Sequence, residues 1–594
     1  MGAPFPLDFA PGIVKVDAPY ALRGRFIDCD KVRFVKGKAE KWKGWELFAA
    51  VDSGVPRAMK GWDDFSDARW LAIGTHTKLY LADFAGVITN ITPIRESGTL
   101  GADPFAMVDT SNEVTVTDTA HGLSIGTSVY FSGATASGGI TIDGEYSVDT
   151  IIDVDHYTIL HSTPATSTDA TGGGASVLYE YEINAGERNV IVGDGYGTGT
   201  FGTGTYGTPR ASSNFLIYAR MWSLETYGEN LLALPSGNFL YQWDPDTPAA
   251  HAARVANSPF GNFMFMTNER YPVVLGVNGD NMALAWPDQN DITNWTPGSA
   301  STANERKLQK GSRLVAGANL AGISNLLWTD EAIYQMNYTG QRNFVYNTLV
   351  AGEQCGLIGP HAFVIVAGRA YWMSNFDFHM YGGSVSGIPN SQDIRDWLYE
   401  QLDSRQNWKA VARFSAIHNE VLWNFVPEGQ TEPTLYVAVS LDDFSWTHGT
   451  LNRTAWTENG GIDPHTYATD ADGNIFDHEI GVDAAGEAMA AFLESAPLDT
   501  DDGSRSMNIW GYIPNFQRQS GDIEITIKTW DMPQHTAVQE LQAITIVEGQ
   551  GIEDLHINGR QASVRLDCFQ MGGDFRLGIP RVEISPAGKR RGAE

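Results

Sequence analysis

Residues 420–439 read EVLWNFVPEGQTEPTLYVAV, which is an apolar run, a polar turn and a second apolar run. Short runs rich in Val, Leu and aromatic residues favour strands, and a polar turn that carries Gly predicts a β-hairpin between them. Six further stretches follow the same pattern, at residues 70–81, 230–243, 271–286, 325–336, 370–381 and 466–476. Repeated hairpins therefore decide the fold class, which is all-β.

The spacing of these hairpins predicts how they assemble. From Leu231 onward they recur every roughly 43–52 residues, a period suited to the four-stranded blades of a β-propeller. One small sheet cannot cover both of its faces, whereas blades stacked around an axis cover one another, and aromatic side chains fill the wedge between them. The sequence thus predicts a β-propeller of about six to eight blades.

Composition agrees with a large, β-rich globular protein. The 594 residues include 63 Gly and 17 Trp, and only 19% are charged, which is not the composition of a disordered chain. Helical patterns are scarce. Residues 391–402 predict one helix, with Ile394, Trp397, Leu398 and Leu402 on one face and Ser391 or Asn390 as its cap. Residues 483–494 are compatible with a helix or a strand.

A small β-domain is expected within a loop of the propeller. Residues 112–160 alternate apolar and polar positions, as half-buried strands require. The alternating strands after about residue 495 predict a separate C-terminal β-sandwich. The expected domains are an N-terminal arm with the first propeller strands (1–108), the insert (109–180), the propeller with a Gly-rich loop at 193–207 (181–490), and a C-terminal platform (491–594).

Charge and cysteine content exclude several classes of protein. The formal net charge of −31 argues against a basic face that grips phosphate. Cys29, Cys355 and Cys568 lie far apart, so neither a disulfide framework nor a zinc site is predicted. Residues 1–19 lack the pattern of a signal peptide, and no run of about 18 apolar residues predicts a membrane span. The chain is therefore expected to be made in a cytoplasm.

Two glycine motifs in the loop at 193–207 match GxGxxG, beginning at Gly197 and Gly202. The dinucleotide mechanism needs a strand before the motif and a helix after it, whose N-terminus meets the pyrophosphate. Residues 208–213 read TPRASS, which is not an amphipathic helix. We therefore predict no cofactor there.

Two acidic turns resemble fragments of calcium loops: Asp470, Asp472 and Asn474 in one, and Asp499 and Asp501 in the other. A full loop needs further oxygen ligands and a Glu at its twelfth position, which both lack, and Asp-Gly is also a favoured hairpin turn. A turn is the preferred interpretation, and cation binding stays open. No metal site is predicted.

No catalytic residues are predicted. The HExxH, GxSxG and GxxxxGK[ST] patterns are absent from the sequence. Residues 440–446 (SLDDFSW) resemble the Asp-box turn of sialidases without its Gly, and no carboxylate pair is singled out for glycoside hydrolysis. His121 is interpreted as a packing or turn residue. We expect a protein that is not an enzyme.

Several stretches in order resemble the nozzle, or tubular, proteins of podovirus tails. Trp42, Gly44 and Trp45 carry the match near the start, in RFIDCDKVRFVKGKAEKWKGW (25–45). The longest match spans residues 326–383, with CGLIGP (355–360) and Trp372-Met373 as its clearest parts. Residues 70–81, 83–93, 193–207 and 575–588 are similar as well. The insert resembles a small β-domain of phage proteins and ubiquitin-activating enzymes, without the catalytic parts of the latter.

The resemblance implies a structural virion protein at the tail tip, synthesised in the host cytoplasm. Six copies would form a ring below the adaptor and portal, gate the exit and conduct genomic DNA during ejection. Tail fibres or spikes are possible further partners, and DNA would pass without sequence-specific binding. Because each copy carries −31 charges, we expect an acidic or neutral channel face that lets DNA slide.

Two alternatives stay open from the sequence. One is a polysaccharide-degrading propeller or tailspike, which requires two carboxylates about 5–10 Å apart in a pocket. The other is a carbohydrate-binding propeller, which predicts near-identical pockets in successive blades. The expected hexamer number, the segment that closes the channel and the surface that docks fibres do not follow from the residues.

Overall fold

The computed structural model describes residues 3–16, 19–191, 216–342, 344–458, 466–499, 505–531 and 538–587. It divides into two compact units, one of residues 1–48, 320–335 and 348–594 and one of residues 49–319 and 336–347. The Gly-rich loop at 193–207 lies outside the described residues.

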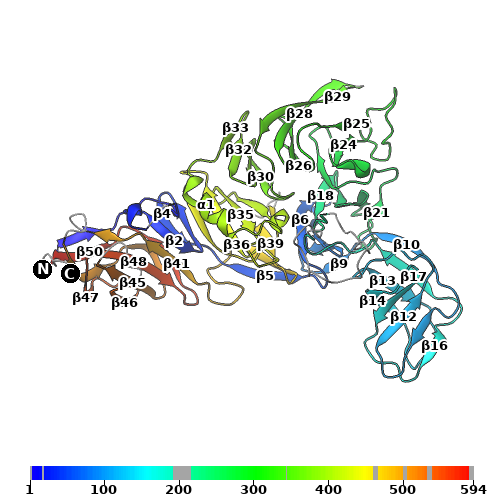
Figure 1. Ribbon diagram of the computed structural model, residues 1–594, viewed down its shortest axis with the longest axis horizontal. Coiled ribbons are helices and arrows are strands. Elements are labelled where there is room, and N and C mark those ends of the chain that lie inside the picture. Colours follow the sequence, from blue (N-terminus) through cyan, green and yellow to red (C-terminus); the bar gives the residue numbers. More distant parts are fainter. Residues whose placement is uncertain are drawn as a thin grey trace, which may run out of the picture. The chain divides into compact units, whose positions relative to one another are not determined.

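Seven four-stranded antiparallel sheets among the described residues are the blades, and the chain has the all-β propeller fold that its sequence predicts (Figure 1). The first three consist of β6 (Pro56–Asp63), β7 (Arg69–Thr75), β8 (Leu79–Asp83) and β9 (Ile88–Asn90); β18 (Trp222–Tyr227), β19 (Asn230–Pro235), β20 (Tyr241–Trp243) and β21 (Ala253–Arg254); and β22 (Phe263–Met266), β23 (Pro272–Leu275), β24 (Ala283–Trp286) and β25 (Asn304–Lys307).

The next three blades also use strands in chain order. They are β26 (Leu314–Asn319), β27 (Asn325–Thr329), β28 (Ala332–Gln341) and β29 (Phe344–Glu353); β30 (Phe363–Val366), β31 (Arg369–Met373), β32 (Phe378–Tyr381) and β33 (Val385–Gly387); and β34 (Val411–Ser415), β35 (Glu420–Phe425), β36 (Leu435–Ser440) and β37 (Trp446–Thr450). The last blade joins β38 (Ala455–Glu458), β39 (Thr466–Thr469) and β40 (Asn474–His478) to β5 (Trp45–Ala50), from the other end of the chain.

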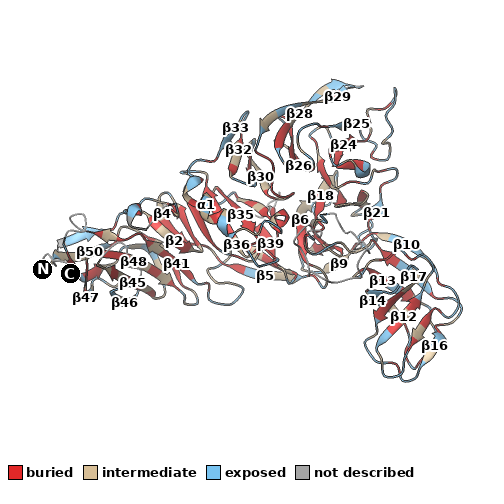
Figure 2. Ribbon diagram, viewed as in Figure 1, coloured by how far each residue is buried: buried red, intermediate tan, exposed pale blue. Residues whose placement is uncertain are grey.

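The seven hairpins predicted from the sequence are the second and third strands of these seven blades. The quoted stretch at 420–439 forms β35 and β36, paired from Glu420 opposite Ser440 to Phe425 opposite Leu435. Second and third strands lie inside a sheet, where both faces are covered by neighbouring blades. In Figure 2, β35, β36 and β39 are buried along most of their length, which explains why their sequences are so apolar.

Buried indoles connect neighbouring blades. The Nε1–H of Trp222 donates to the carbonyl of Thr75, at 2.6 Å. The indole of Trp372 donates to the carbonyl of Cys355, at 2.7 Å. Trp423 of β35 donates to the carbonyl of Ala362, at 3.1 Å. Each indole therefore fills a wedge and also satisfies a buried carbonyl.

The insert is an eight-stranded β-domain. Its strand order is β10 (Ile94–Thr99), β17 (Leu178–Glu182), β13 (Ser128–Ser132), β14 (Gly144–Ile151), β15 (His156–Leu160), β12 (Glu113–Thr117), β11 (Phe105–Met107) and β16 (Asp169–Gly172). The alternating positions of the sequence lie inside it, with Val114, Val116, Val129, Tyr157 and Ile159 fully buried. The domain begins at β10, so the expected start at residue 109 is too late.

Three further sheets form the C-terminal domain, which includes strands from both ends of the chain. Their orders are β1 (Ala3–Pro6), β50 (Arg581–Pro586), β43 (Met507–Ile513) and β47 (Glu553–Gly559); β2 (Phe26–Asp30), β41 (Ala491–Ser495), β48 (Gln561–Cys568), β45 (Ile523–Trp530) and β46 (Glu540–Ile546), with β42 (Leu498–Asp499) beside β48; and β3 (Val32–Val35), β4 (Lys38–Lys41), β49 (Asp574–Leu577) and β44 (Phe516–Ser520).

Strands β1 to β4 correct the expected domain boundaries. Residues 3–41, expected as an arm in front of the propeller, pair with strands more than 450 residues later in the chain. The isolated alternation of each strand cannot reveal such a partner, because the pairing energy is non-local. The C-terminal domain is therefore completed by the first residues of the chain.

The described residues contain one α-helix and three short 3₁₀ turns. Helix α1 (Gln392–Gln401) confirms the helix expected at 391–402, and it buries Ile394 and Leu398. The stretch at 483–494, left open between helix and strand, forms turns and the start of β41. The other helical segments are single 3₁₀ turns, η1 (Pro19–Leu22), η2 (Val277–Gly279) and η3 (Asn407–Lys409). No helix in the described ranges is long and apolar enough to cross a membrane.

We predict that Trp423→Ala lowers the free energy of unfolding by about 3–5 kcal/mol, because it leaves a cavity between two blades and removes the hydrogen bond from the indole to the Ala362 carbonyl. Calorimetry, which resolves separate domain transitions, measures the change. The matched control is Phe376→Ala, since the Phe376 side chain is 80% exposed and its loss should change stability by less than about 0.5 kcal/mol. Equal effects of the two substitutions would contradict the wedge role.

Candidate functional site

The N-terminal strands contact the last two blades of the propeller, and we call this contact the joint. It comprises residues 26–45, the blades β34–β37 and β38–β40 with β5, and the turn at 479–485. Asp30 accepts hydrogen bonds from the backbone N–H and the hydroxyl of Thr450 at 2.8 Å each, and the Tyr436 hydroxyl accepts from the Lys31 N–H at 3.1 Å. The joint thus connects the C-terminal domain to the propeller within one compact unit.

The Trp-Lys-Gly-Trp stretch lies where two chain segments cross. A Cβ at Gly44 would lie 2.1 Å from the carbonyl oxygen of Asp483 and 2.6 Å from its nitrogen, so no other residue fits. The backbone of Trp45 donates to Asp483, at 3.0 Å, and its ring stacks on His478, at 5.3 Å between centroids. Trp42 packs on Tyr436, at 4.6 Å. Glycine permits the close crossing, and the two indoles fill the space on either side.

Glu479 is the centre of a buried ionic cluster in the joint. Its carboxylate accepts two hydrogen bonds from the Arg33 guanidinium, at 2.9 and 3.1 Å. Arg413 approaches the same carboxylate at 3.6 Å, and His418 at 3.1 Å. A second carboxylate, Glu420, lies 3.8 Å from Arg33. Arg33 and Arg413 are almost completely buried, so their charges are balanced by protein groups and not by water.

The pKa values of the cluster follow from burial and from the charged groups that each residue contacts. Burial acts to raise the pKa of Glu479, but the charges of Arg33 and Arg413 and the hydrogen bond from His418 hold it well below its usual value. Burial would lower the pKa of Arg33, but Glu479 and Glu420 raise it. Burial lowers the pKa of Arg413, and its charged neighbours offset only part of that shift. Glu479 therefore stays ionised and holds several cations at once.

A third guanidinium lies beside the cluster. Arg453 donates from Nε to Nε2 of His478, at 2.9 Å, and from Nη1 to the carbonyl of Asn452, at 2.6 Å. Its guanidinium lies over the rings of Trp45 and Phe476, at 4.9 and 4.3 Å from their centroids. Burial lowers the pKa of Arg453 to about 9. Aromatic faces thus replace carboxylates around this charge.

The CGLIGP stretch, like the Trp-Gly-Trp stretch, is a close crossing of backbones. A Cβ at Gly356 would lie 2.1 Å from the carbonyl oxygen of Asp330, and one at Gly359 would lie 2.6 Å from that of Trp408. The N–H of Leu357 donates to the Thr329 carbonyl, at 3.0 Å. Both motifs are therefore explained by packing.

The two acidic turns that resemble calcium loops use their carboxylates in different ways. Asp470 accepts hydrogen bonds from the N–H of Asp472 and of Asn474, at 2.9 and 3.0 Å, and from the Asn474 amide, at 2.9 Å. This is the turn between β39 and β40, and its carboxylate serves the backbone. Asp499 is buried and pairs with Arg23 at 2.9 Å, while Asp501 lies outside the described residues.

The remaining residues singled out in the sequence have packing roles. His121 is buried, and its ring accepts from the Leu123 N–H at 3.0 Å, in the turn expected there. All three cysteines are buried. Burial raises the pKa of the Cys29 and Cys568 thiols and that of Cys355 to about 11, so all three remain thiols at neutral pH.

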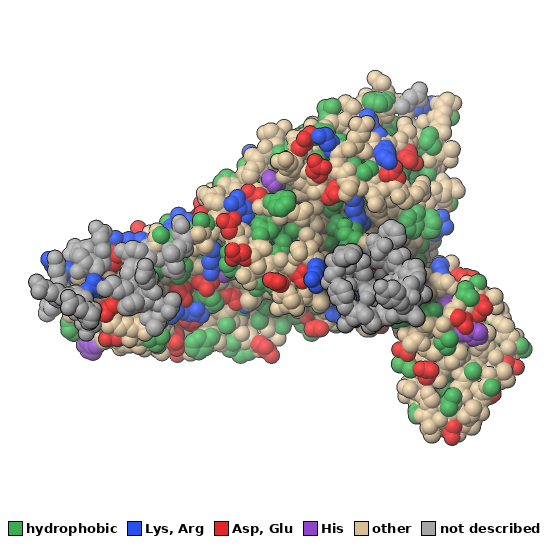
Figure 3. Space-filling view, in the orientation of Figure 1, with side chains coloured by type: hydrophobic (Ala, Val, Ile, Leu, Met, Phe, Trp, Pro, Cys, Tyr) green, Lys and Arg blue, Asp and Glu red, His purple; other side chains and the backbone are tan. Residues whose placement is uncertain are grey.

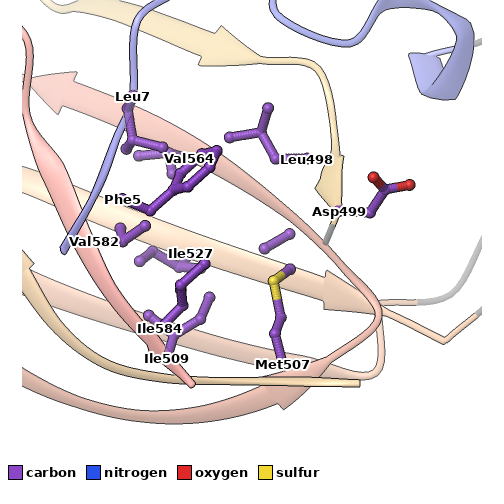
Figure 4. Close-up of a pocket in the computed structure, with 11 residues that line it drawn as sticks. Phe5, Leu7, Leu498, Asp499, Met507, Ile509, Ile527, Val564, Val582 and Ile584 are labelled. Carbon is purple, nitrogen blue, oxygen red and sulfur yellow. The ribbon is translucent and has the colours of Figure 1, made fainter. Parts of the chain in front are cut away.

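A small pocket lies between two sheets of the C-terminal domain (Figure 4). Apolar side chains of β1, β43, β45, β48 and β50 point into it, and Asp499 lies at its edge. The cavity has a volume of about 20 Å³, which is room for one or two waters. With one carboxylate among its lining residues, it does not have the acid pair of a glycosidase.

Charge is distributed unevenly along the chain. The insert, residues 94–182, contains thirteen Asp and Glu residues and a single basic residue, Arg95. Figure 3 shows these acidic side chains spread over the face of the domain that is in view. Among the residues that the structure describes, no group of three or more His, Cys, Asp or Glu is arranged to hold a metal ion.

Comparisons with known proteins found only weak similarities, all to solved structures. No protein-family model matches the chain, and no curated protein is detectably similar to it. Similar solved structures include the phage phi92 endosialidase (10% identity, 76% of this chain and 59% of that one, TM-score 0.18), a virginiamycin B lyase from Staphylococcus aureus (8%, 73% and 96%, 0.26) and the GH74 enzyme of Niastella koreensis (11%, 71% and 67%, 0.31). Similarities this weak carry no argument about activity.

We predict that Gly44→Ala destabilises the joint by about 3 kcal/mol or more, since the new methyl group meets backbone atoms that cannot move aside. Thermal unfolding of the full chain measures this loss. Gly298→Ala is the matched control, because a Cβ there meets nothing within 4 Å. A Gly44→Ala protein as stable as the control would show that the two chain segments do not cross as described.

We also predict that Glu479→Gln costs more stability than Arg33→Met. The first substitution leaves several buried cations without their shared carboxylate, at about 3–5 kcal/mol, whereas the second leaves that carboxylate with Arg413 and His418. Urea unfolding gives both values. Lys307→Met, which removes an exposed ion pair with Asp280, should change stability by less than about 1 kcal/mol. The reverse order of Glu479 and Arg33 would contradict the shared-carboxylate arrangement.

Proposed function

We propose that this chain is a structural, non-enzymatic component of a short phage tail, in which six copies form the distal nozzle ring that gates and conducts genomic DNA. One observation carries the proposal. The residues that make the sequence similar to podovirus nozzle proteins, Trp42, Gly44 and Trp45, are the residues that join the propeller to the C-terminal domain. A chain built for that architecture needs them, because no larger residue than Gly44 fits the crossing.

The proposed partners follow from the position of a nozzle in a tail. A ring of six copies would bind the tail adaptor and, through it, the portal, and its outer surface would offer places for fibres or spikes. Heterologous contacts that close on themselves generate such rings. Because each copy carries −31 formal charges, the channel face is expected to be acidic or neutral, and duplex DNA would slide past a wall of its own sign.

The alternative is a carbohydrate-binding or polysaccharide-degrading propeller protein of the tail. It would place the activity in a pocket with paired carboxylates, or in similar pockets on successive blades. The pocket in the C-terminal domain has neither the size nor the second carboxylate for this role. The alternative therefore makes a separate prediction, which glycan hydrolysis and glycan-array binding test.

We predict that the purified chain, mixed with its adaptor protein, sediments as a complex with six copies of the chain, and that it releases no sugar from host polysaccharide. Analytical ultracentrifugation measures the first outcome and reducing-end analysis the second. A chain that stays monomeric beside the adaptor contradicts the nozzle proposal. Turnover of a polysaccharide by that monomer would support the enzymatic alternative in its place.

A further inference from the structure

His478, at the end of β40, occupies an enclosed position in the joint. Its ring lies between Trp45 of β5 and Trp456 of β38, at 5.3 and 4.8 Å between centroids. The side chain is buried, with 2% of its surface exposed. Two indoles thus hold the imidazole in place from elements that are far apart in the sequence.

The hydrogen bond from Arg453 defines the protonation state of this ring. A guanidinium carries only N–H donors, so Nε2 of His478, 2.9 Å from Nε of Arg453, must be the acceptor. An imidazole nitrogen that accepts a hydrogen bond carries no proton. The joint as it stands therefore requires a neutral His478.

The charges that face His478 come from every element packed around it. Arg453 precedes β38, Arg413 belongs to β34, Arg33 belongs to β3, and Glu479 follows His478 itself. The Glu479 carboxylate is already shared by Arg33, Arg413 and His418. Burial, followed by the charges of Arg453 and Arg413, lowers the pKa of His478 well below its usual value.

A further carboxylate near Arg453, Asp470, is committed elsewhere. Its two oxygens accept the hydrogen bonds of the turn between β39 and β40. Its charge favours the charged form of Arg453, but burial still lowers the pKa of Arg453 to about 9. Asp470 is thus already engaged by its own turn and is not available to pair with a protonated His478.

We propose that the joint is an acid-sensitive lock, which holds the C-terminal domain to the propeller only while His478 is neutral. Protonation of Nε2 breaks the hydrogen bond from Arg453 and adds a positive charge beside three guanidinium groups. The new N–H of the imidazolium then faces the N–H of Arg453. The two cations therefore repel each other at hydrogen-bond distance. This inference concerns a single chain and does not rest on the nozzle proposal.

The sign and window of the effect follow from proton linkage. A histidine in the opened joint titrates near pH 6.5, while the closed joint excludes the proton, so closure weakens about tenfold for each pH unit below that value. The pKa of Glu479 is held well below its usual value, so this carboxylate stays charged at pH 5 and does not contribute. From pH 6.5 to pH 5, closure should weaken about 15-fold in total.

Other histidines near the joint must be separated from His478. His418 contacts Glu479 at 3.1 Å, and His448 contacts Asp28 at 3.1 Å. Burial also lowers the pKa of His448, although Asp28 opposes that shift. His448 thus acts in the same direction as His478, and only a substitution at His478 can assign the effect.

Hydrogen exchange of the full chain tests the proposal, because it reports local opening strand by strand. After correction for intrinsic rates, wild-type exchange in β3 and β40 should rise at least about 15-fold between pH 6.5 and pH 5, while β35 and β36 stay protected. In His478→Gln the response should fall severalfold, to what His448 contributes, because the amide oxygen can accept from Arg453 and does not titrate. His379→Gln, which removes another buried histidine whose pKa burial lowers, should leave the joint response unchanged.

The results that would overturn the proposal are equally specific. Wild-type exchange in β3 and β40 that does not change with pH excludes an acid-sensitive joint. A full response in His478→Gln assigns the effect to His448 and removes His478 from it. If His478→Gln does not fold, Arg453→Met decides: without the donor and its charge, protonation of His478 is opposed less and the response should shrink, and an unchanged response overturns the proposal.

Discussion

The shared carboxylate of Glu479 is the interaction on which the rest of the joint depends. It lies buried beside Arg33, Arg413 and His418, and water cannot replace any of these partners. A buried charge network has one low-energy arrangement, since any displacement leaves a charge unpaired at low dielectric. The network therefore specifies how the N-terminal strands meet the last two blades, more than it adds stability.

Close backbone crossings complement that network. Gly44 and Gly356 each lie where another backbone would collide with a Cβ. Indoles such as Trp423 fill the remaining wedges and donate to buried carbonyls. Close backbone contacts, packed indoles and buried charges thus occur together where sheets meet. Together they fix how the short strands of this long chain pack against one another.

Much of the fold followed from local patterns. Seven quoted hairpins became the inner strand pairs of seven blades, and the helix at 391–402 formed as expected. The joint, by contrast, was not anticipated: Glu479, Arg413 and Arg453 carried no motif, and Arg33 drew notice only within a resemblance. An excess of basic residues in 23–43, in a chain of net charge −31, was the available signal for buried acidic partners.

The sequence by itself determined the all-β class, the blade period and the alternating strands of the insert, because turn chemistry and two-residue periodicity act over a few neighbouring residues. Tertiary structure alone decided that β5 completes the last blade and that β1 to β4 complete the C-terminal domain. It also decided that Glu479 collects several cations and that His478 must be neutral. The pairing of β1 to β5 depends on partners hundreds of residues away, and the contacts of Glu479 and His478 come from side chains on other strands. Both are set by the packing of the whole unit and not by any local pattern.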